Sequence, residues 1–564
     1  MKATSAISSV LFITVHACAF PQAPQPQYHP KTTTGLSVHT SSGIIDGHAA
    51  SDATAVSEYL GIPFAEPPVG ELRFAAPQKY NGGSVVNGTD FGFTCPSPPR
   101  TNNGKAALTT YGNFLVDQLL ETDGYEFSED CLTLNVWTKP DPRGAKKAVM
   151  IWIYGGSFTG GGTANPLYNG QYLADTEDVV IVTLNYRLNI LGFPGNPAGT
   201  NNLGLLDVRL AIEWIQDNIG ALGGDPARMT LFGQSAGGGL VDLYSFAYPS
   251  DPIVQGLIAE SGVASGTKLK TLEEASVYWY QVADIVGCGN LTSNADDVLA
   301  CMRTKDYNSL LTAIPMSTFI PSYDNVVVFD DYNARAIAGN FAQLPMLTGS
   351  NDNEEALFAA IADSPGQTVN LTSQVLGNLE FACAAQLRAN ISNAHGIPNW
   401  LYRYFGDFAN TQLSPKLGAY PGAYHGAEIS QIWNTTGAGS LHGTAASGVS
   451  RLQSIPVRSF VIIPKYFRTH ERVFGGCGLH YLQKSPVNLS TEQYLQNCIV
   501  RGAWTTFAKD PDNGLTYYQD GWPEYNPLSA SLIRLGYNNK NGTNRVLPAL
   551  YDLTCGVLVA VAGA

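Results

Sequence analysis

The stretch of this 564-residue sequence best suited to nucleophilic chemistry is Gly233-Gln234-Ser235-Ala236-Gly237. A short apolar run with strand character, 229–232, precedes it, and small and then apolar residues that can begin a helix follow at 238–244. Gly-x-Ser-x-Gly between a strand and a helix is the signature of a nucleophile elbow, which holds the serine hydroxyl clear of the sheet edge. The pentapeptide alone is also compatible with an ordinary Gly/Ser-rich turn, so its surroundings must decide.

A serine hydroxyl is a poor nucleophile without a base, and the base needs an acid that orients it. In folds built around such an elbow the chain order is serine, acid, histidine. The histidines that follow Ser235 are His395, His425, His442, His470 and His480. We favour His425, because small residues around it predict an exposed loop and the apolar run 400–405 before it predicts a strand.

The candidates for the acid follow a second predicted strand, 344–350. They are Asp352, Glu354 and Glu355, and the local sequence does not choose among them. Backbone N–H groups are needed for the negative charge that develops on the substrate oxygen. The loop Gly155-Gly156-Ser157, directly after an apolar run, and the N–H of Ala236 are suited to this task.

The elements that must position these residues alternate between strands and helices. The runs 148–154 and 179–184 are continuously apolar, which is typical of strands buried on both faces of a parallel sheet. Between 205 and 219 apolar residues recur at helical spacing, and Gly223-Gly224 predicts the end of that helix. A further strand is predicted at 256–259. We therefore predict an α/β fold with a mostly parallel sheet, helices on both faces, and Ser235 at the carboxyl end of a central strand.

Composition narrows the class of protein. Apolar residues make up 44% of the chain, enough for a large core, whereas charged residues make up 14% and the net charge is −14. Nucleic-acid binding needs clustered Lys and Arg, so this composition argues against a nucleic acid as a partner. An acidic chain also does not steer anionic substrates by its overall field.

The first residues predict a secretory signal peptide. Residues 1–19 have a basic start, an apolar centre and a small-residue cleavage site, as a signal peptide has, and 20–34 predict a flexible Pro/Gln-rich leader. We find no other apolar run near 18 residues, so we expect a secreted, extracellular protein without an integral membrane segment. The sequons Asn-x-Ser/Thr are glycosylation candidates, at Asn87, Asn290, Asn370, Asn390, Asn434, Asn488 and Asn541.

The cysteines beyond the signal peptide are even in number, which in an oxidising compartment indicates disulfides. Cys95 and Cys131 enclose residues 96–130, where apolar residues at helical spacing predict an amphipathic helix. Two interpretations remain open: a movable lid, or an ordinary packed surface loop. We expect residues 35–564 to form one domain, within which about 457–485 is an unusually basic segment. That segment is either a surface insertion or translated non-coding sequence.

Several motifs in combination resemble the type-B carboxylesterases and lipases of the α/β-hydrolase fold. They are 128–137 (SEDCLTLNVW), 152–158 (WIYGGSF), 185–187 (NYR), 204–207 (GLLD), 223–226 (GGDP) and 232–238 (FGQSAGG). The resemblance covers roughly 36–435 and resumes near 504–508. It implies a serine hydrolase that cleaves small-molecule or lipid esters, with no metal and no organic cofactor.

The resemblance also implies roles for individual residues. Ser235, Glu354 and His425 correspond to the family's catalytic triad, and Gly156, Ser157 and Ala236 correspond to its oxyanion hole. The disulfides that it implies are Cys95–Cys131, Cys288–Cys301 and Cys383–Cys555, which leaves Cys477 and Cys498 to each other.

Four departures from the family pattern bear on the substrate, the oxyanion loop and the choice of the acid. Gln234 replaces a usual glutamate, Ser157 and Glu355 replace usual glycines, and no tryptophan lies in 96–130, where cholinesterases carry a choline-binding indole. Since quaternary ammonium recognition depends on aromatic faces, we expect neutral esters with apolar acyl groups instead. The alternatives are a triacylglycerol or sterol-ester lipase that contacts a lipid interface through a lid, and a non-catalytic adhesion or binding relative.

Overall fold

A computed structural model describes residues 37–83, 85–98, 108–120, 125–314, 319–362, 371–413, 422–436, 489–540, 542–552 and 555. All of these belong to one compact unit, 33–564. The predicted signal peptide, the leader and the basic segment 457–485 lie outside the described residues, as do Cys477, Asn370, Asn488 and Asn541.

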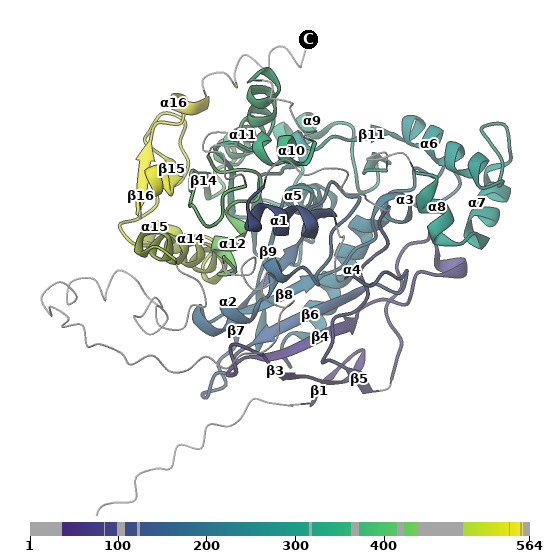
Figure 1. Ribbon diagram of the computed structural model, residues 1–564, viewed down its shortest axis with the longest axis horizontal. Coiled ribbons are helices and arrows are strands. Elements are labelled where there is room, and N and C mark those ends of the chain that lie inside the picture. Colours follow the sequence, from purple (N-terminus) through teal and green to yellow (C-terminus); the bar gives the residue numbers. More distant parts are fainter. Residues whose placement is uncertain are drawn as a thin grey trace, which may run out of the picture. The chain divides into compact units, whose positions relative to one another are not determined.

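An eleven-stranded sheet forms the centre of the described chain (Figure 1). In spatial order its strands are β16 (Thr543–Val546), β15 (Leu532–Leu535), β14 (Asn399–Tyr404), β13 (Met346–Asn351), β10 (Gly256–Glu260), β9 (Gly224–Gln234), β7 (Lys147–Ile153), β8 (Val180–Leu184), β6 (Thr133–Thr138), β4 (Ser57–Pro63) and β3 (His48–Ala49). From β8 to β15 every neighbouring pair is parallel, while both ends of the sheet are antiparallel. The prediction of a mostly parallel sheet is confirmed.

Smaller sheets and the helices surround this centre. The small sheets contain β1 (Ser37–Thr40), β2 (Gly43–Asp46) and β5 (Val85–Asn87), and β11 (Lys270–Thr271) with β12 (Ser322–Tyr323). The helices are α1 (Thr110–Leu120), α2 (Gln171–Thr176), α3 (Asn189–Gly192), α4 (Leu203–Asn218), α5 (Ala236–Ala247), α6 (Leu272–Ile285), α7 (Ala295–Thr304), α8 (Tyr307–Thr312), α9 (Tyr332–Ala338), α10 (Glu355–Ala362), α11 (Leu371–Ala394), α12 (Ile429–Ile432), α14 (Thr491–Lys509), α15 (Gly514–Tyr517) and α16 (Ala549–Asp552). Short 3-10 turns lie at η1 (Gly70–Leu72), η2 (Pro166–Tyr168), η3 (Ala264–Gly266) and η4 (Tyr537–Asn539).

The predicted strands at 148–154 and 179–184 are β7 and β8, and every residue of both is buried. Their β-branched and aromatic side chains fit a sheet that is covered on both faces, which explains the continuous apolar runs. The helices α4, α5 and α14 pack against the central strands and supply that cover.

The predicted helix at 205–219 is α4, but its end was placed wrongly. The helix stops at Asn218, because residues 219–223 form turns and the N–H of Gly224 bonds back to Ile219 O at 2.9 Å. Gly223, with φ of 87°, turns the chain directly into β9. The glycine pair therefore marks the start of the elbow strand rather than the helix terminus.

The described part of the 96–130 loop packs onto the main core. Tyr111, Phe114 and Leu115, all on α1, are buried in the same hydrophobic cluster as the central sheet. Thr109 N–H donates to Leu413 O at 2.8 Å, which ties the start of this helix to a distant segment. This packing favours the interpretation as a packed loop for the residues that the structure describes.

Three disulfides join the cysteines that the resemblance pairs: Cys95–Cys131, Cys288–Cys301 and Cys383–Cys555. Cys498 is also disulfide-bonded. Of the sequon asparagines within the described ranges, Asn87 and Asn290 are exposed, while Asn390 and Asn434 are half-buried. No helix in the described part of the chain is long and apolar enough to cross a membrane.

Candidate active site

Ser235 stands in a strained turn between β9, which ends at Gln234, and α5, which begins at Ala236. Its φ of 59° and ψ of −126° are unusual for a residue with a side chain. Backbone bonds hold this conformation: Ser235 N–H donates to Glu260 O at 2.8 Å, and Gly239 N–H donates to Ser235 O at 2.9 Å. The strain predicted for a nucleophile elbow is therefore present at this serine.

The flanking glycines are required by close backbone contacts. A Cβ atom at Gly237 would lie 2.1 Å from Ile153 O, and one at Gly233 would lie 2.7 Å from Gly237 O. Neither neighbour is a flexible side chain, so neither can move aside at low cost. The elbow is thus seated against the end of β7.

His425 and Glu354 come from loops that follow neighbouring parallel strands, β14 and β13. His425 Nδ1 lies 2.7 Å from Glu354 Oε2, and both side chains are buried. His425 Nε2 has no hydrogen-bond partner in the described part of the chain. The elbow meets this loop, since a Cβ at Gly426 would lie 3.5 Å from Gln234 Nε2. The histidine thus has one nitrogen fixed by an acid and the other available to a proton donor.

The second oxygen of Glu354 is also bound. Ser261 Oγ donates to Glu354 Oε1 at 2.7 Å, and the backbone N–H of Asn351 donates to the same oxygen at 2.6 Å. Sequence reasoning missed both donors. Ser261 directly follows β10 and Asn351 ends β13, so the available signal was that each lies where a strand of the parallel sheet ends.

The structure separates the three acid candidates. Glu354 meets His425, whereas Asp352 and Glu355 are only half-buried. Glu355 begins α10 and lies against α11, because a Cβ at Gly377 would be 2.2 Å from its Oε2. Burial raises the pKa of both Asp352 and Glu355.

Two phenylalanine rings contact the imidazole. Phe358 of α10 and Phe381 of α11 lie with ring centroids 4.9 Å and 4.8 Å from His425. They are parallel to each other, at 6.1 Å between centroids and an interplanar angle of 3°. Sequence reasoning missed this pair too, because the two rings come from different helices that only the tertiary fold brings together. The two rings restrict the movement of the imidazole.

The proposed oxyanion donors surround the nucleophile. Gly156 and Ser157 have positive φ, 116° and 56°, which turns the loop after β7. A Cβ at Gly155 would lie 2.7 Å from Ser235 Cβ, so this loop lies directly against the serine. Among the described backbone contacts of turns and loops, the N–H groups of Gly156, Ser157 and Ala236 donate to no other group. These three groups are thus available to an incoming oxygen atom.

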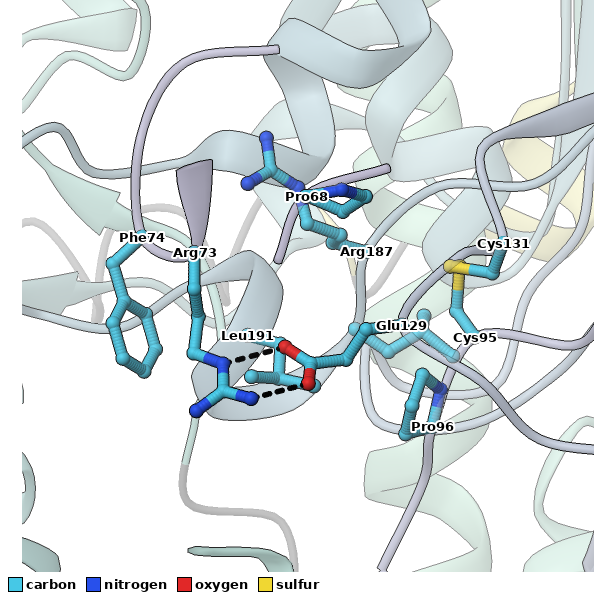
Figure 2. Close-up of a pocket in the computed structure, with 10 residues that line it drawn as sticks. Pro68, Arg73, Phe74, Cys95, Pro96, Glu129, Cys131, Arg187 and Leu191 are labelled. Carbon is cyan, nitrogen blue, oxygen red and sulfur yellow. Dashed lines mark hydrogen bonds and ion pairs between the residues drawn. A yellow bond between two sulfur atoms is a disulfide. The ribbon is translucent and has the colours of Figure 1, made fainter. Parts of the chain in front are cut away.

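A small cavity of about 10 Å³ is lined by the Cys95–Cys131 disulfide, Arg73 and Glu129 among others (Figure 2). Arg73 Nε donates to Glu129 Oε1 at 2.6 Å, and Arg73 Nη1 donates to Arg303 O at 3.0 Å. The buried arginine therefore ties the loop to the end of α7. This explains the glutamate of the 128–137 motif as a structural residue.

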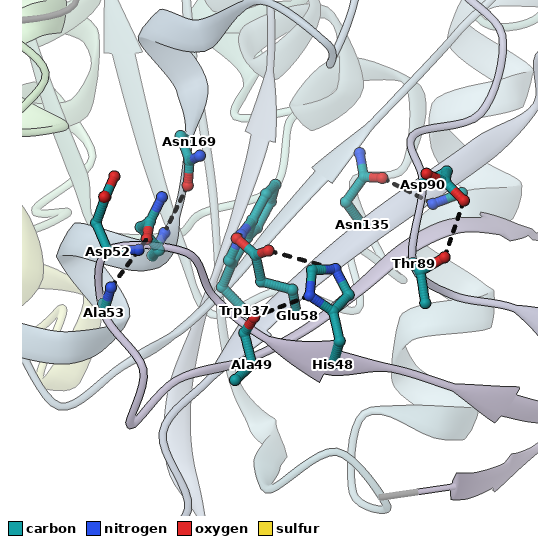
Figure 3. A network of polar contacts seen from close by, with 12 residues as sticks. His48, Ala49, Asp52, Ala53, Glu58, Thr89, Asp90, Asn135, Trp137 and Asn169 are labelled. Carbon is teal, nitrogen blue, oxygen red and sulfur yellow. Dashed lines mark hydrogen bonds and ion pairs between the residues drawn. The ribbon is translucent and has the colours of Figure 1, made fainter. Parts of the chain in front are cut away.

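A second histidine–glutamate pair lies at the β3–β4 edge (Figure 3). His48 Nε2 is 3.5 Å from Glu58 Oε2, and Trp137 Nε1 donates to Glu58 Oε1 at 2.7 Å. Burial raises the pKa of Glu58. The described residues contain no cluster of three or more His, Cys, Asp or Glu side chains arranged to hold a metal ion.

Comparison with known proteins identifies the class. The family model described as "Carboxylesterase family" matches residues 34–380. A chlorogenic acid esterase of Aspergillus niger is 38% identical over 427 residues, which cover 71% of this chain and 77% of that protein. Secreted lipase 5 of Gibberella zeae is 33% identical over 453 residues, covering 73% and 82%. An acetylcholinesterase of Electrophorus electricus is 35% identical over 352 residues, covering 60% and 54%.

A solved structure of PNB esterase matches with a TM-score of 0.68 and 25% identity, covering 91% of this chain and 97% of that one. The fold is thus the α/β-hydrolase fold, as predicted. The chain belongs to the carboxylesterase family and is a carboxylic-ester hydrolase. The secreted relative and the three disulfides are consistent with an extracellular location.

Proposed function

We propose that this chain is a secreted serine esterase that cleaves neutral esters with apolar acyl groups through Ser235, His425 and Glu354. The observation that carries the proposal is the set of contacts that His425 makes. Its Nδ1 is fixed by a fully bonded Glu354, its Nε2 has no partner in the described chain, and its loop meets Gln234 of the elbow that holds Ser235. A general base needs this arrangement.

The reaction follows from these positions. Ser235 Oγ attacks the ester carbonyl as His425 Nε2 takes its proton, which gives a tetrahedral intermediate with a negatively charged oxygen. The N–H groups of Gly156, Ser157 and Ala236 stabilise this oxygen. His425 then returns the proton to the leaving alcohol, and an acyl-serine remains. Water, activated by His425 in the same way, releases the acid and restores the serine.

The substrate preference rests on the departures around the elbow. Gln234 is buried beside Gly426 and places a neutral amide where the family usually has a carboxylate. The pocket thereby lacks one attraction for a cationic alcohol. The packed α1 favours a soluble ester over an emulsified lipid, because its apolar side chains are already buried in the main core.

The test is Ser235→Ala on p-nitrophenyl esters of increasing acyl length. We expect hydrolysis to fall by about 10⁴-fold or more with an unchanged fold, since the nucleophile is lost. Ser276→Ala is the matched control, because Ser276 lies on α6, whose buried side chains belong to a separate hydrophobic cluster. Activity that survives the change at Ser235 would disprove the nucleophile assignment.

An organophosphate probe separates this proposal from that of a non-catalytic binding relative. We expect one adduct, on the peptide that contains Ser235, and none in the Ser235→Ala protein. Emulsified triglyceride tests the lipase alternative, for which the 82% coverage of secreted lipase 5 is the favouring observation. A jump in rate above the solubility limit of the substrate would support the lipase, and its absence would support the esterase.

A further inference from the structure

Three fully buried carboxyl groups cluster at the proposed triad, and one of them is the acid of the triad itself. They belong to Glu260 at the end of β10, Glu354 after β13, and Glu428 just before α12. Within the described chain, no lysine or arginine side chain pairs with any of them. Buried like charges without cations oppose one another strongly, so the three groups do not all ionise together near neutral pH.

Glu354 is the group whose surroundings suit a carboxylate. Its Oε1 accepts hydrogen bonds from Ser261 Oγ and the Asn351 N–H, and its Oε2 meets His425 Nδ1. Each of these stabilises a negative charge. Glu354 is thus the member of the cluster that holds the charge opposite the imidazole.

Glu428 and Glu260 are bonded through one oxygen only. Glu428 Oε2 accepts from Asn351 Nδ2, and Glu260 Oε1 accepts from Trp504 Nε1 at 2.7 Å. Glu428 Oε1 and Glu260 Oε2 are buried and face no hydrogen-bond donor among the described residues. A neutral carboxyl group costs less here than a carboxylate, because the oxygen without a donor then carries no negative charge in a buried site.

Of the other titratable groups that face Glu428 in the described chain, only His425 can carry a positive charge, and that charge lowers the pKa of Glu428. The others are Tyr402 and Tyr404 of β14 and Tyr424. Burial raises the pKa of all three tyrosines, which remain neutral. Burial, followed by the charge of Glu354, likewise raises the pKa of Glu428 to about 7. Burial and then the charge of Glu428 raise that of Glu260.

Asn351 connects Glu428 to both sides of the triad. Its Nδ2 donates to Tyr424 O at 2.7 Å as well as to Glu428, and its backbone N–H donates to Glu354. Tyr424 precedes His425 directly, and Glu428 follows it by three residues. The Asn351 side chain thereby holds the His425 loop at Tyr424 and at Glu428, against the loop that carries Glu354.

We propose that Glu428, with Glu260 as its buried neighbour, is a neutral, protonated positioning residue of the triad. Its carboxyl group holds the His425 loop through Asn351 without placing a second negative charge beside the imidazole. This inference rests on the proposed function. The neutral Gln234 agrees with it, because Gln234 pairs in register with Glu260 and a glutamate there would add a fourth acid to the cluster.

The activity test compares Glu428→Ala with Glu428→Gln. We expect E428A to lower kcat by about tenfold or more with KM nearly unchanged, because the histidine loop loses its anchor. Glutamine imitates the neutral acid, so E428Q should restore kcat to within about threefold of the parent at pH below about 7. An E428Q protein as impaired as E428A at that pH would overturn the proposal, since the carboxylate would then be required. E428Q is isosteric and keeps the test valid if E428A does not fold.

The protonation test uses the inactive Ser235→Ala protein, so it does not depend on turnover. A protonated Glu428 stabilises the fold fully below its ordinary pKa of 4.5, and this stabilisation is lost as pH rises through about 7. The Tm of S235A should therefore fall relative to that of S235A/E428Q as pH rises. Infrared difference spectra between the two proteins should show a protonated-carboxyl band that fades over the same range. A constant Tm difference, or a missing band, would overturn the proposal even where Ser235 proves to be the nucleophile.

Discussion

The described residues contain two histidine–glutamate pairs, and one of them belongs to the proposed catalytic triad. His425 and Glu354 meet at 2.7 Å in loops that follow parallel strands, and the His425 loop meets Gln234 of the elbow. His48 and Glu58 meet at 3.5 Å on antiparallel strands at the edge of the sheet (Figure 3). Because the two pairs contain the same residue types, the difference between their surroundings indicates what a catalytic histidine and its acid require.

The first requirement is a rigid acid. Both oxygens of Glu354 are bonded and its side chain is fully buried, whereas Glu58 has one indole donor and a longer contact to its histidine. The second requirement is a confined imidazole. The side chain of His425 is 6% exposed and touches two aromatic rings, while that of His48 is 37% exposed. A histidine–carboxylate contact alone is therefore a weak sign of catalysis.

The largest effect in this comparison is expected when the acid of the first pair is neutralised. Glu354→Gln should lower kcat by about 10³–10⁴-fold, because the imidazole loses the partner that fixes its tautomer and balances its charge. Steady-state kinetics on a p-nitrophenyl ester measures the effect, with circular dichroism to check the fold. A loss smaller than about tenfold would show that another carboxylate, such as Glu355, does this work.

The packing of the elbow that holds Ser235 can be disrupted by a substitution that changes no polar side chain. Gly237→Ala places a Cβ 2.1 Å from Ile153 O, so we expect a loss of about 1–3 kcal/mol in unfolding free energy together with most of the activity. Denaturant titration and ester hydrolysis measure the two effects. Gly220→Ala is the matched control, because no atom lies within 4 Å of its added Cβ. Equal stability of the two variants would contradict the close packing of the elbow.

The aromatic contacts should have a smaller effect. Phe381→Leu removes a ring 4.8 Å from His425, and we expect kcat to fall by about three- to tenfold with KM changed less. Phe91→Leu serves as the control, since that ring contacts Trp137 instead of the site. A change confined to KM would mean that Phe381 binds substrate and does not confine the imidazole.

The smallest effect on activity is expected at the second pair. Glu58→Gln should leave kcat within about twofold, because this pair adjoins no nucleophile. Its stability should nevertheless change with pH. Burial raises the pKa of Glu58, so the stabilisation from its protonated form is present at low pH and is lost as pH rises through that raised value. The Tm of the variant should thus gain on the parent with rising pH, as thermal melts at several pH values would show.

Much of this molecule follows from local sequence. The apolar runs at 148–154 and 179–184 specify strands that need cover on both faces, and Gly233 and Gly237 specify a turn that only glycine can flank. These features lie within a few residues of one another, so the periodicity and the sterics of the chain are enough to predict them.

The acid could not be chosen among Asp352, Glu354 and Glu355 in this way, because all three occupy one short loop. Their separation depends on where β13 ends relative to β14 and β10, and strand register is a property of the whole sheet. For the same reason the sequence did not reveal Ser261 or Asn351.

The sequence by itself determined which groups could react and in which order they occur along the chain. The family resemblance pointed to Glu354 as the acid, and only the tertiary structure showed its contact with His425 and the buried Glu260 and Glu428 nearby. The physical reason is that charge and hydrogen bonding act over a few ångströms in space, while the residues that supply them are about a hundred positions apart: Ser261 bonds Glu354 across a sequence separation of 93. Folding brings these distant residues within hydrogen-bonding distance, and only then can they act on one another.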